Sequence, residues 1–159
     1  MSLTDAHEVT LIADRSAIGR LLSGYFRALD SKRLDTAWAE ATFTADAELN
    51  FPPDRVAEGR AAVLELTRQI ASWWKATLHL TTDHLVETDG DTASLHANLS
   101  VTHIHFDDDP RPEVTNFVLG GVCDLACVRT PRGWRIARFT LREVWSLGDP
   151  PAVVLKDGH

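Results

Sequence analysis

Hydrophobic residues near the start of the chain recur at the spacing of an α-helix. Five of them fall on one helix face, at intervals of one, three or four residues: Ile18, Leu21, Leu22, Tyr25 and Leu29. Asp14 or Ser16 stands where an N-cap is expected. The pattern predicts an amphipathic helix that follows a flexible polar tail over residues 1–9 and ends at the polar run 30–33.

Two further helices and a short strand are expected before residue 77. Residues 34–41 predict a short helix that carries Trp38 toward the same interior as the first helix. Residues 46–51 predict a strand, which the following Pro-Pro-Asp ends. A third helix is expected after residue 59, and its apolar stripe consists of Val63, Leu66, Ile70 and Trp73 or Trp74.

The hydrophobic period changes to that of β-strands from residue 77 onward. Strands are predicted over residues 78–87, 92–106, 114–129 and 133–145. A turn at Asp89-Gly90 favours a hairpin between the first two. Because the helices precede a four-stranded antiparallel meander, the fold class is α+β. The domain is expected to span residues 10–147, followed by a loose C-terminal tail over 148–159.

The strand over residues 93–105 has two faces of different character. Alternate residues of a strand share a face. One face is apolar until its last two members, in the order Ala93, Leu95, Ala97, Leu99, Val101, His103 and His105. A wall that changes from aliphatic to titratable at one end is typical of a pocket mouth.

Length and charge exclude several classes of partner. The 159 residues predict one domain, and the formal net charge is −7 with no cluster of Lys or Arg. Nucleic acid and anionic membranes are therefore poor partners. No apolar run reaches the length of a membrane span, and the N-terminus is acidic where a signal peptide is basic. We expect a cytoplasmic protein in which Cys123 and Cys127, four residues apart in one strand, do not pair.

Candidate chemistry rests mainly on histidine and carboxylate side chains. As single residues, Asp30 is more typical of an Asx turn or a helix cap, and Tyr25 of an ordinary core tyrosine. An imidazole both takes and gives a proton near pH 7. Strand parity places His84 on an apolar face and makes it the better candidate, whereas it places His79 on a polar face directed to solvent.

A metal site is the main alternative for the histidines at the end of the long strand. His103 and His105, followed by the acidic run 107–109 and Glu113, have the ligand types of an iron or zinc site. They are similar to the first motif of cupin barrels, but the glutamate lies too far downstream and no glycine precedes them at the expected distance. We expect no metal. The chain also lacks a Gly-x-Ser-x-Gly elbow and a glycine-rich phosphate loop, so no nucleotide or other cofactor is expected.

Several short motifs in a fixed order resemble the SnoaL-like branch of the nuclear-transport-factor-2-like superfamily. They cover residues 12–146 and comprise the run 18–34, Trp38, the strand 47–51, Glu58-Gly59-Arg60, Thr77-Leu78-His79, the turn 89–93 and Gly133-Trp134-Arg135-Ile136. Within that superfamily the chain is most similar to scytalone dehydratase, hexachlorocyclohexane dehydrochlorinase and bile-acid dehydratase, all cofactor-free lyases. The resemblance implies a cone formed by a strongly curved antiparallel sheet that three N-terminal helices cap.

The resemblance also assigns site residues by position. Asp30 matches the pocket aspartate of these lyases, and His79 matches their catalytic histidine. Tyr25 matches the tyrosine of the bile-acid enzyme, and His103 the second histidine of the scytalone enzyme. The bile-acid enzyme has an arginine near the end of its last strand, and Arg142 or equally Arg138 corresponds to it. The expected substrate-binding residues are Trp38, Phe51, Val101, Asp124, Arg142 and Trp145. The serine and asparagine that help the scytalone enzyme bind its substrate are absent from the strand around residues 122–127, where Asp124 takes one of the two places, so the resemblance does not carry its substrate.

The matched residues imply a base-catalysed reaction without a cofactor. A carboxylate beside an imidazole fixes its tautomer and raises its basicity. Asp30 would thus prepare His79 to remove a proton, while Tyr25 or His103 holds the departing oxygen or the developing enolate. The implied activity is a dehydratase-like lyase, an isomerase or a cyclase acting on a small apolar cyclic or polyketide-like molecule. The alternative is a non-catalytic ligand-binding module or the small β subunit of an aromatic-ring dioxygenase. Either way, a homodimer or homotrimer is expected.

Overall fold

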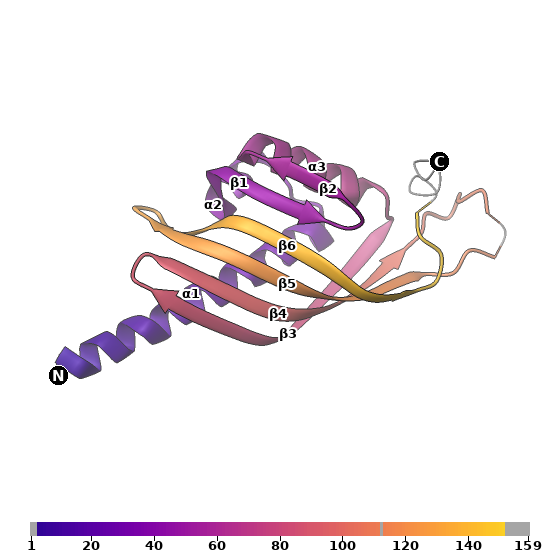
Figure 1. The fold of residues 1–159 in the computed structure, drawn as a ribbon. Helices are drawn as coiled ribbons and strands as arrows, with labels where there is room; N and C mark the ends of the chain where they lie inside the picture. Colours follow the sequence, from indigo (N-terminus) through magenta and orange to yellow (C-terminus); the bar gives the residue numbers. More distant parts are fainter. Residues whose placement is uncertain (1–2, 112, 152–159) are drawn as a thin grey trace.

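A computed structural model describes residues 3–111 and 113–151, which form three helices and one six-stranded sheet (Figure 1). The helices are α1 (Leu3–Ser31), α2 (Thr36–Thr42) and α3 (Arg60–Ser72). The strands are β1 (Phe43–Phe51), β2 (Arg55–Glu58), β3 (Ala76–Asp89), β4 (Thr92–Ile104), β5 (Phe117–Thr130) and β6 (Gly133–Leu147). The α+β class is therefore confirmed. Within the described ranges, no helix is both long and apolar enough to cross a membrane.

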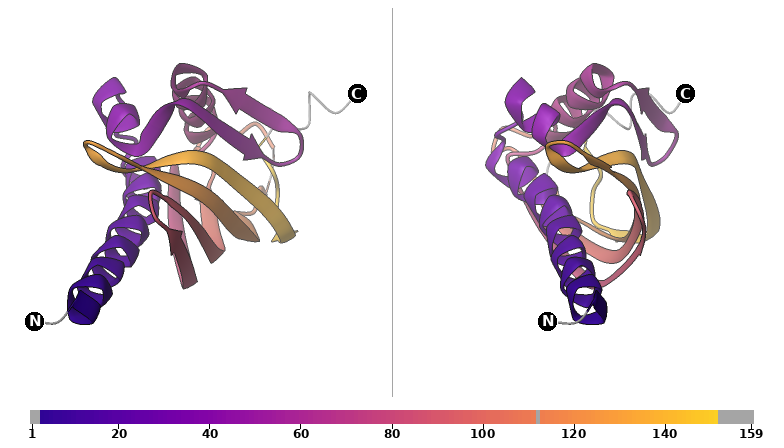
Figure 2. Two further views of the ribbon diagram at one scale, coloured as in Figure 1. Left: turned by 60° about the vertical axis from the view of Figure 1, so that its left-hand side comes forward. Right: turned by 90° about the vertical axis from the view of Figure 1, so that its left-hand side faces the viewer.

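The sheet is an open, strongly curved cone (Figure 2). Its strand order is β2-β1-β6-β5-β4-β3, so β3 to β6 form the predicted meander. Strand β1 pairs in parallel with β6 and antiparallel with β2. The sequence analysis missed β2 because a four-residue strand is too short to show a clear alternation. The helices lie against the concave side of the sheet, and α1 crosses it (Figure 2).

Helix α1 begins at Leu3, so the prediction of an N-terminal tail is wrong for residues 3–9. Asp14 does not cap the helix. Its buried side chain accepts hydrogen bonds from the guanidinium of Arg129 and the indole N–H of Trp134. Arg129 also lies over the Trp134 ring, 4.4 Å from its centroid. These contacts fasten α1 to the hairpin between β5 and β6, and the hydrogen bond from Arg129 lowers the pKa of Asp14.

We expect Asp14→Asn to lower the melting temperature by roughly 3 to 6 °C, because the amide removes the charge that faces Arg129 and turns a donor toward it. Asp91 bonds the same guanidinium, but its side chain is 81% exposed. Asp91→Asn is therefore the matched control, with an expected shift below roughly 2 °C. Thermal unfolding followed by circular dichroism measures both shifts. Equal shifts would show that burial of Asp14 adds nothing to its pairing.

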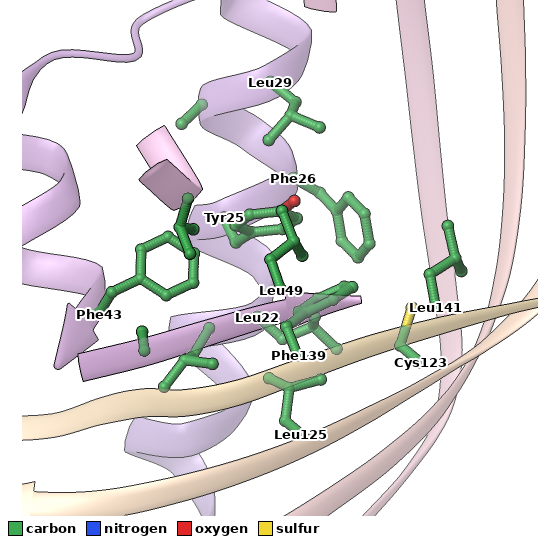
Figure 3. Packing of buried hydrophobic residues seen from close by; sticks show 14 of the residues in the cluster. Leu22, Tyr25, Phe26, Leu29, Phe43, Leu49, Cys123, Leu125, Phe139 and Leu141 are labelled. Carbon is green, nitrogen blue, oxygen red and sulfur yellow. The ribbon is translucent and has the colours of Figure 1, made fainter. Parts of the chain in front are cut away.

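The hydrophobic core fills the space between α1 and the concave face of the sheet (Figure 3). The ring of Tyr25 lies at its centre, with centroids 5.1 Å from Phe26, 5.9 Å from Phe43 and 4.8 Å from Phe139. The three contacts are tilted or edge-on, which is the favourable geometry for aromatic pairs. Leu22 packs beneath this group on the same helix. The helix face predicted from the spacing of apolar residues is thus the face that builds the core.

Strand β4 has the two faces that its alternation predicts. Leu95, Ala97, Leu99, Val101 and His103 are all buried on the concave side. The side chains between them are exposed or half-buried. The change from aliphatic to imidazole side chains along this wall is therefore real.

Strand β3 contradicts its parity prediction. Thr77 and His79 face the concave side, whereas Leu78 and Leu80 are each 58% exposed on the convex side. A β-bulge explains the reversal: between Thr82 and Leu85 the strand has one residue more than β4, and Asp83 adopts a positive φ of 54°. The two halves of β3 therefore present opposite parities, and His84 is exposed.

Candidate active site

A cavity of about 370 Å³ lies between the concave face of the sheet and helices α1 and α3. Its walls are mainly apolar, with Phe26, Leu99 and Phe139 among them. Its polar lining includes His79 and His103. A mainly apolar cavity of this volume with a few convergent polar groups is typical of a small-molecule site.

Asp30 and His79 meet at this cavity. Asp30 lies in the last turn of α1, and its Oδ1 atom is 2.6 Å from Nδ1 of His79. Its other oxygen, Oδ2, accepts the backbone N–H of His79 at 3.1 Å. Thr77 donates its hydroxyl to Oδ1 at 2.7 Å. All three donors belong to β3, so one strand holds the carboxylate and the imidazole in a fixed relation.

The environment of the pair keeps the carboxylate charged and sets the imidazole tautomer. Burial by itself raises the pKa of Asp30, but the hydrogen bonds from His79 and Thr77 outweigh it and leave this pKa below its usual value. A carboxylate can only accept, so Nδ1 of His79 carries a proton, and in the neutral ring Nε2 is the atom with the lone pair. The ring of Phe26 stacks on the imidazole at 4.7 Å and restrains it. His79 therefore has the form of a general base.

His103 lies beside this pair on the same concave wall, on the neighbouring strand β4. Its ring centroid is 6.2 Å from that of His79 and 4.4 Å from that of Trp74. Its Nδ1 atom is 3.1 Å from the backbone oxygen of Phe117. Burial lowers the pKa of His103 to about 4, which leaves the imidazole neutral at pH 7.

Tyr25 lines the cavity but its hydroxyl has a partner in the core. Its side chain is buried, and its hydroxyl forms a hydrogen bond with Thr67 of α3. Burial raises the pKa of Tyr25, so the phenol stays protonated. The ring of Trp38 stacks behind it at 6.0 Å. The predicted catalytic role of Tyr25 remains a prediction.

Residues 10–140 match the family model of the SnoaL-like domain. The chain belongs to the SnoaL-like domain family. The resemblance found in the sequence is thereby confirmed. An uncharacterised protein of Mycobacterium tuberculosis H37Rv, Rv2910c, is 32% identical over 131 residues, which cover 82% of this chain and 85% of that protein.

Solved structures share this SnoaL-like fold at low sequence identity. The dehydrochlorinase LinA-type3 of Novosphingobium barchaimii, which acts on hexachlorocyclohexane, is 16% identical and covers 89% of this chain and 94% of its own, with a TM-score of 0.76. A candidate scytalone dehydratase of Novosphingobium aromaticivorans is 22% identical and covers 93% of both chains, with a TM-score of 0.76. Both likenesses establish the fold.

Two of the predicted substrate-binding residues line the cavity of this SnoaL-like domain. They are Phe51, at the end of β1, and Val101, on β4. Trp38 lies behind Tyr25 in the core rather than in the lining. Trp38 can therefore influence a substrate in the cavity only through Tyr25.

The remaining predicted binding residues lie on the convex face, so their assignment needs correction. Asp124 pairs there with His96 at 2.7 Å and with Arg142 at 3.2 Å. Trp145 is 50% exposed and covers Gly120 from outside. Arg138, the rival of Arg142, binds Glu48 at 3.1 Å. The resemblance assigned these positions by sequence order alone, without the two bulges in the pairing of β5 and β6 that set which side chains of β6 face inward.

The sequence analysis missed several residues of the site. Thr77 appears there only as part of a motif, although its place two residues before His79 puts it on the same strand face. Arg55 lines the cavity, with its guanidinium 4.7 Å from the ring of Trp73. The short strand that begins at Arg55 was not predicted, so no signal pointed to it.

The chain beyond β6 forms part of the cavity wall, where the sequence analysis expects a loose tail. Asp149 accepts hydrogen bonds from the N–H and hydroxyl of Thr115 at 2.8 and 2.7 Å. Its carbonyl oxygen is 2.8 Å from Nε2 of His105, and Arg111 donates to the next carbonyl at 2.8 Å. The prediction is therefore wrong for residues 148–151, and the residues beyond them lie outside the described ranges.

Proposed function

We propose that this chain is a cofactor-independent lyase of the dehydratase type that acts on a small, largely apolar cyclic molecule. The observation that carries the proposal is the Asp30–His79 pair at a cavity with mainly apolar walls. An imidazole whose Nδ1 is anchored by a carboxylate suits the removal of a proton from carbon next to a carbonyl. The names of the two structural relatives, a dehydrochlorinase and a candidate dehydratase, favour the same reaction class.

The reaction needs only the substrate and one imidazole. Nε2 of His79 takes a proton from the carbon next to the carbonyl, and the electron pair of the broken C–H bond forms an enolate. That pair then forms the new C=C bond while the C–O bond of the β-hydroxyl breaks. The leaving hydroxide takes the proton from His79 and departs as water. His79 ends neutral, and a base of this kind contributes roughly 10² to 10⁴ in rate.

Other functions use the site less fully. An isomerase or a cyclase shares the first proton transfer and differs only in where the proton or the electron pair goes next. A non-catalytic module or a structural dioxygenase subunit, the alternative from the sequence, gains nothing from an imidazole held at 2.6 Å by a carboxylate. The classes that begin with proton abstraction therefore account for more of the observed geometry than a non-catalytic module does.

The test uses two cyclic β-hydroxy ketones, 3-hydroxycyclohexanone and 3-hydroxy-1-tetralone, whose dehydration gives cyclohexenone and 1-naphthol. We expect the protein to speed water loss, followed by ultraviolet absorbance, and His79→Ala to lower this rate roughly 10²- to 10⁴-fold. The matched control is His96→Ala, because His96 forms the same type of carboxylate pair on the convex face. Its rate is expected to equal that of the wild type.

Exchange in D₂O separates the reaction classes. Deuterium uptake at the carbon next to the carbonyl, without loss of water, would assign the dyad to isomerase or cyclase chemistry. If neither water loss nor deuterium uptake exceeds its rate in buffer for both ketones, the proposed reaction on this substrate class is wrong. Equal losses in His79→Ala and His96→Ala would remove His79 from the mechanism.

A further inference from the structure

His103 is held in a single tautomer by the backbone of the next strand. It is paired in register with Phe117 of β5, and its Nδ1 atom lies 3.1 Å from the carbonyl oxygen of that residue. A carbonyl oxygen only accepts hydrogen bonds, so Nδ1 must donate. The proton of the neutral ring is therefore on Nδ1, and Nε2 has a lone pair.

The ring surroundings keep His103 uncharged. Its side chain is packed against the rings of Trp74 and Phe117, with centroids at 4.4 and 5.5 Å. Burial is the main cause that lowers the pKa of His103 to about 4. The imidazoles of His79 and His105 add to this effect, whereas the Phe117 carbonyl and the carboxylate of Asp30 oppose it. At pH 7, Nε2 is thus an acceptor and has no proton to give.

The same polarity appears on the neighbouring strand of the same wall, β3. Nδ1 of His79 donates to Asp30, so Nε2 of the neutral ring is a second acceptor. The two rings are 6.2 Å apart and both line the cavity. Among the described residues, neither Nε2 atom has a hydrogen-bond partner. A ligand in the cavity that approaches the two neutral rings meets two lone pairs.

We infer that His103 is the specificity-determining residue that accepts a hydrogen bond from a ligand hydroxyl, so that the cavity selects neutral hydroxylated ring compounds over their ethers. The inference deepens the proposed function and rests on it only for the statement that the ligand is a substrate. It also changes the role that the resemblance implies for His103: a lone pair does not stabilise an enolate oxygen or protonate a leaving group. A carboxylate or enolate oxygen placed at Nε2 would be repelled.

The tautomer can be tested without any ligand. In protein labelled with ¹⁵N, long-range proton–nitrogen spectra distinguish the two neutral tautomers and the imidazolium, and His103→Phe identifies the signal. We expect the Nδ1–H tautomer of His103 from pH 5 to pH 8. A proton on Nε2, or an imidazolium at pH 7, would overturn the inference.

Selection for a hydroxyl can be tested with 2-naphthol and its methyl ether, in which a methyl group replaces the hydrogen of the only donor. Isothermal titration calorimetry should show that the wild type binds 2-naphthol about three- to tenfold more tightly, the value of one hydrogen bond. His103→Phe should remove the difference, and His96→Phe, on the convex face, should keep it. Equal binding of both compounds by the wild type would contradict the inference. If hydroxy ketones are not dehydrated but this preference persists, the proposed dehydration is wrong, whereas the inference that His103 recognises a ligand hydroxyl is kept.

Discussion

Asp30→Asn is expected to lower the turnover of a hydroxy-ketone substrate roughly 10²- to 10⁴-fold. Oδ1 of the carboxylate accepts from Thr77 and from Nδ1 of His79, while Oδ2 accepts the His79 backbone N–H. With its oxygen at the Oδ1 position, an asparagine turns its NH₂ group against that N–H. With the amide reversed, the NH₂ group donates to Nδ1 and moves the imidazole proton to Nε2. The first orientation weakens the hydrogen bonds that hold His79. The second leaves a proton on Nε2, so that His79 can no longer act as the base.

Steady-state kinetics measure this loss, and the chain supplies its own control. Asp124 holds His96 at 2.7 Å on the convex face, so Asp124→Asn makes the same chemical change away from the cavity and should leave kcat unchanged. Acid provides a second check. Because the pKa of Asp30 is depressed in the folded state, its stabilising effect is present above about pH 4 and is lost as the pH falls through the folded value. The stability gap between wild type and Asp30→Asn should therefore close in acid. Wild-type turnover in Asp30→Asn would contradict the mechanism.

Phe43→Ala is expected to lower the free energy of unfolding by about 3 to 5 kcal/mol. Phe43 is fully buried at the start of β1, and its ring meets Tyr25 and Trp38 edge-on at 5.9 and 5.7 Å. Truncation would leave a void between two helices and the sheet, and the surrounding aromatic rings are too rigid to fill it. Urea unfolding, followed by tryptophan fluorescence, measures the change.

The matched control for Phe43 is Phe106, which is 44% exposed. Phe106→Ala removes the same atoms from a site that solvent already reaches, so we expect a loss below about 1 kcal/mol. Similar losses in both variants would mean that the aromatic cluster around Tyr25 does not hold the fold together. Because Phe43 does not line the cavity, the remaining folded fraction of Phe43→Ala should still bind ligand.

The parts of the fold that follow a simple period were predictable from the sequence. The core face of α1 and the alternating faces of β4 follow from spacing alone, because burial repeats every 3.6 or every two residues. The start of α1 was not predictable in this way. Its first turns have no clear apolar stripe. The contacts that hold this part of the helix come from Arg129 and Trp134, which lie more than 100 residues away from Asp14 in the sequence.

The residues of the site also divide into those that the sequence could predict and those that it could not. Periodicity favoured His84 over His79 and was wrong, because the bulge at Asp83 reverses the parity of β3. Only the resemblance to a family selected His79 and Asp30, and the structure places these two side chains in contact. The same resemblance placed Asp124 and Arg142 in the site, although they lie on the outer face. Position along a strand does not tell which way a side chain points once the pairing contains bulges.

The bulge in β3 decides whether His79 or the neighbouring leucines face the cavity. Leu78 and Leu80 lie in solvent because the residues between and beside them face the cavity. If the same chain paired regularly through Asp83, opposite Asn98, the first half of the strand would shift by one residue against β4 and turn over. The two leucines would then fill the cavity while the imidazole of His79 moved outside. A one-residue change of pairing, with no change in chain length, would thus replace the cavity by a filled core while the outline of the molecule stayed the same.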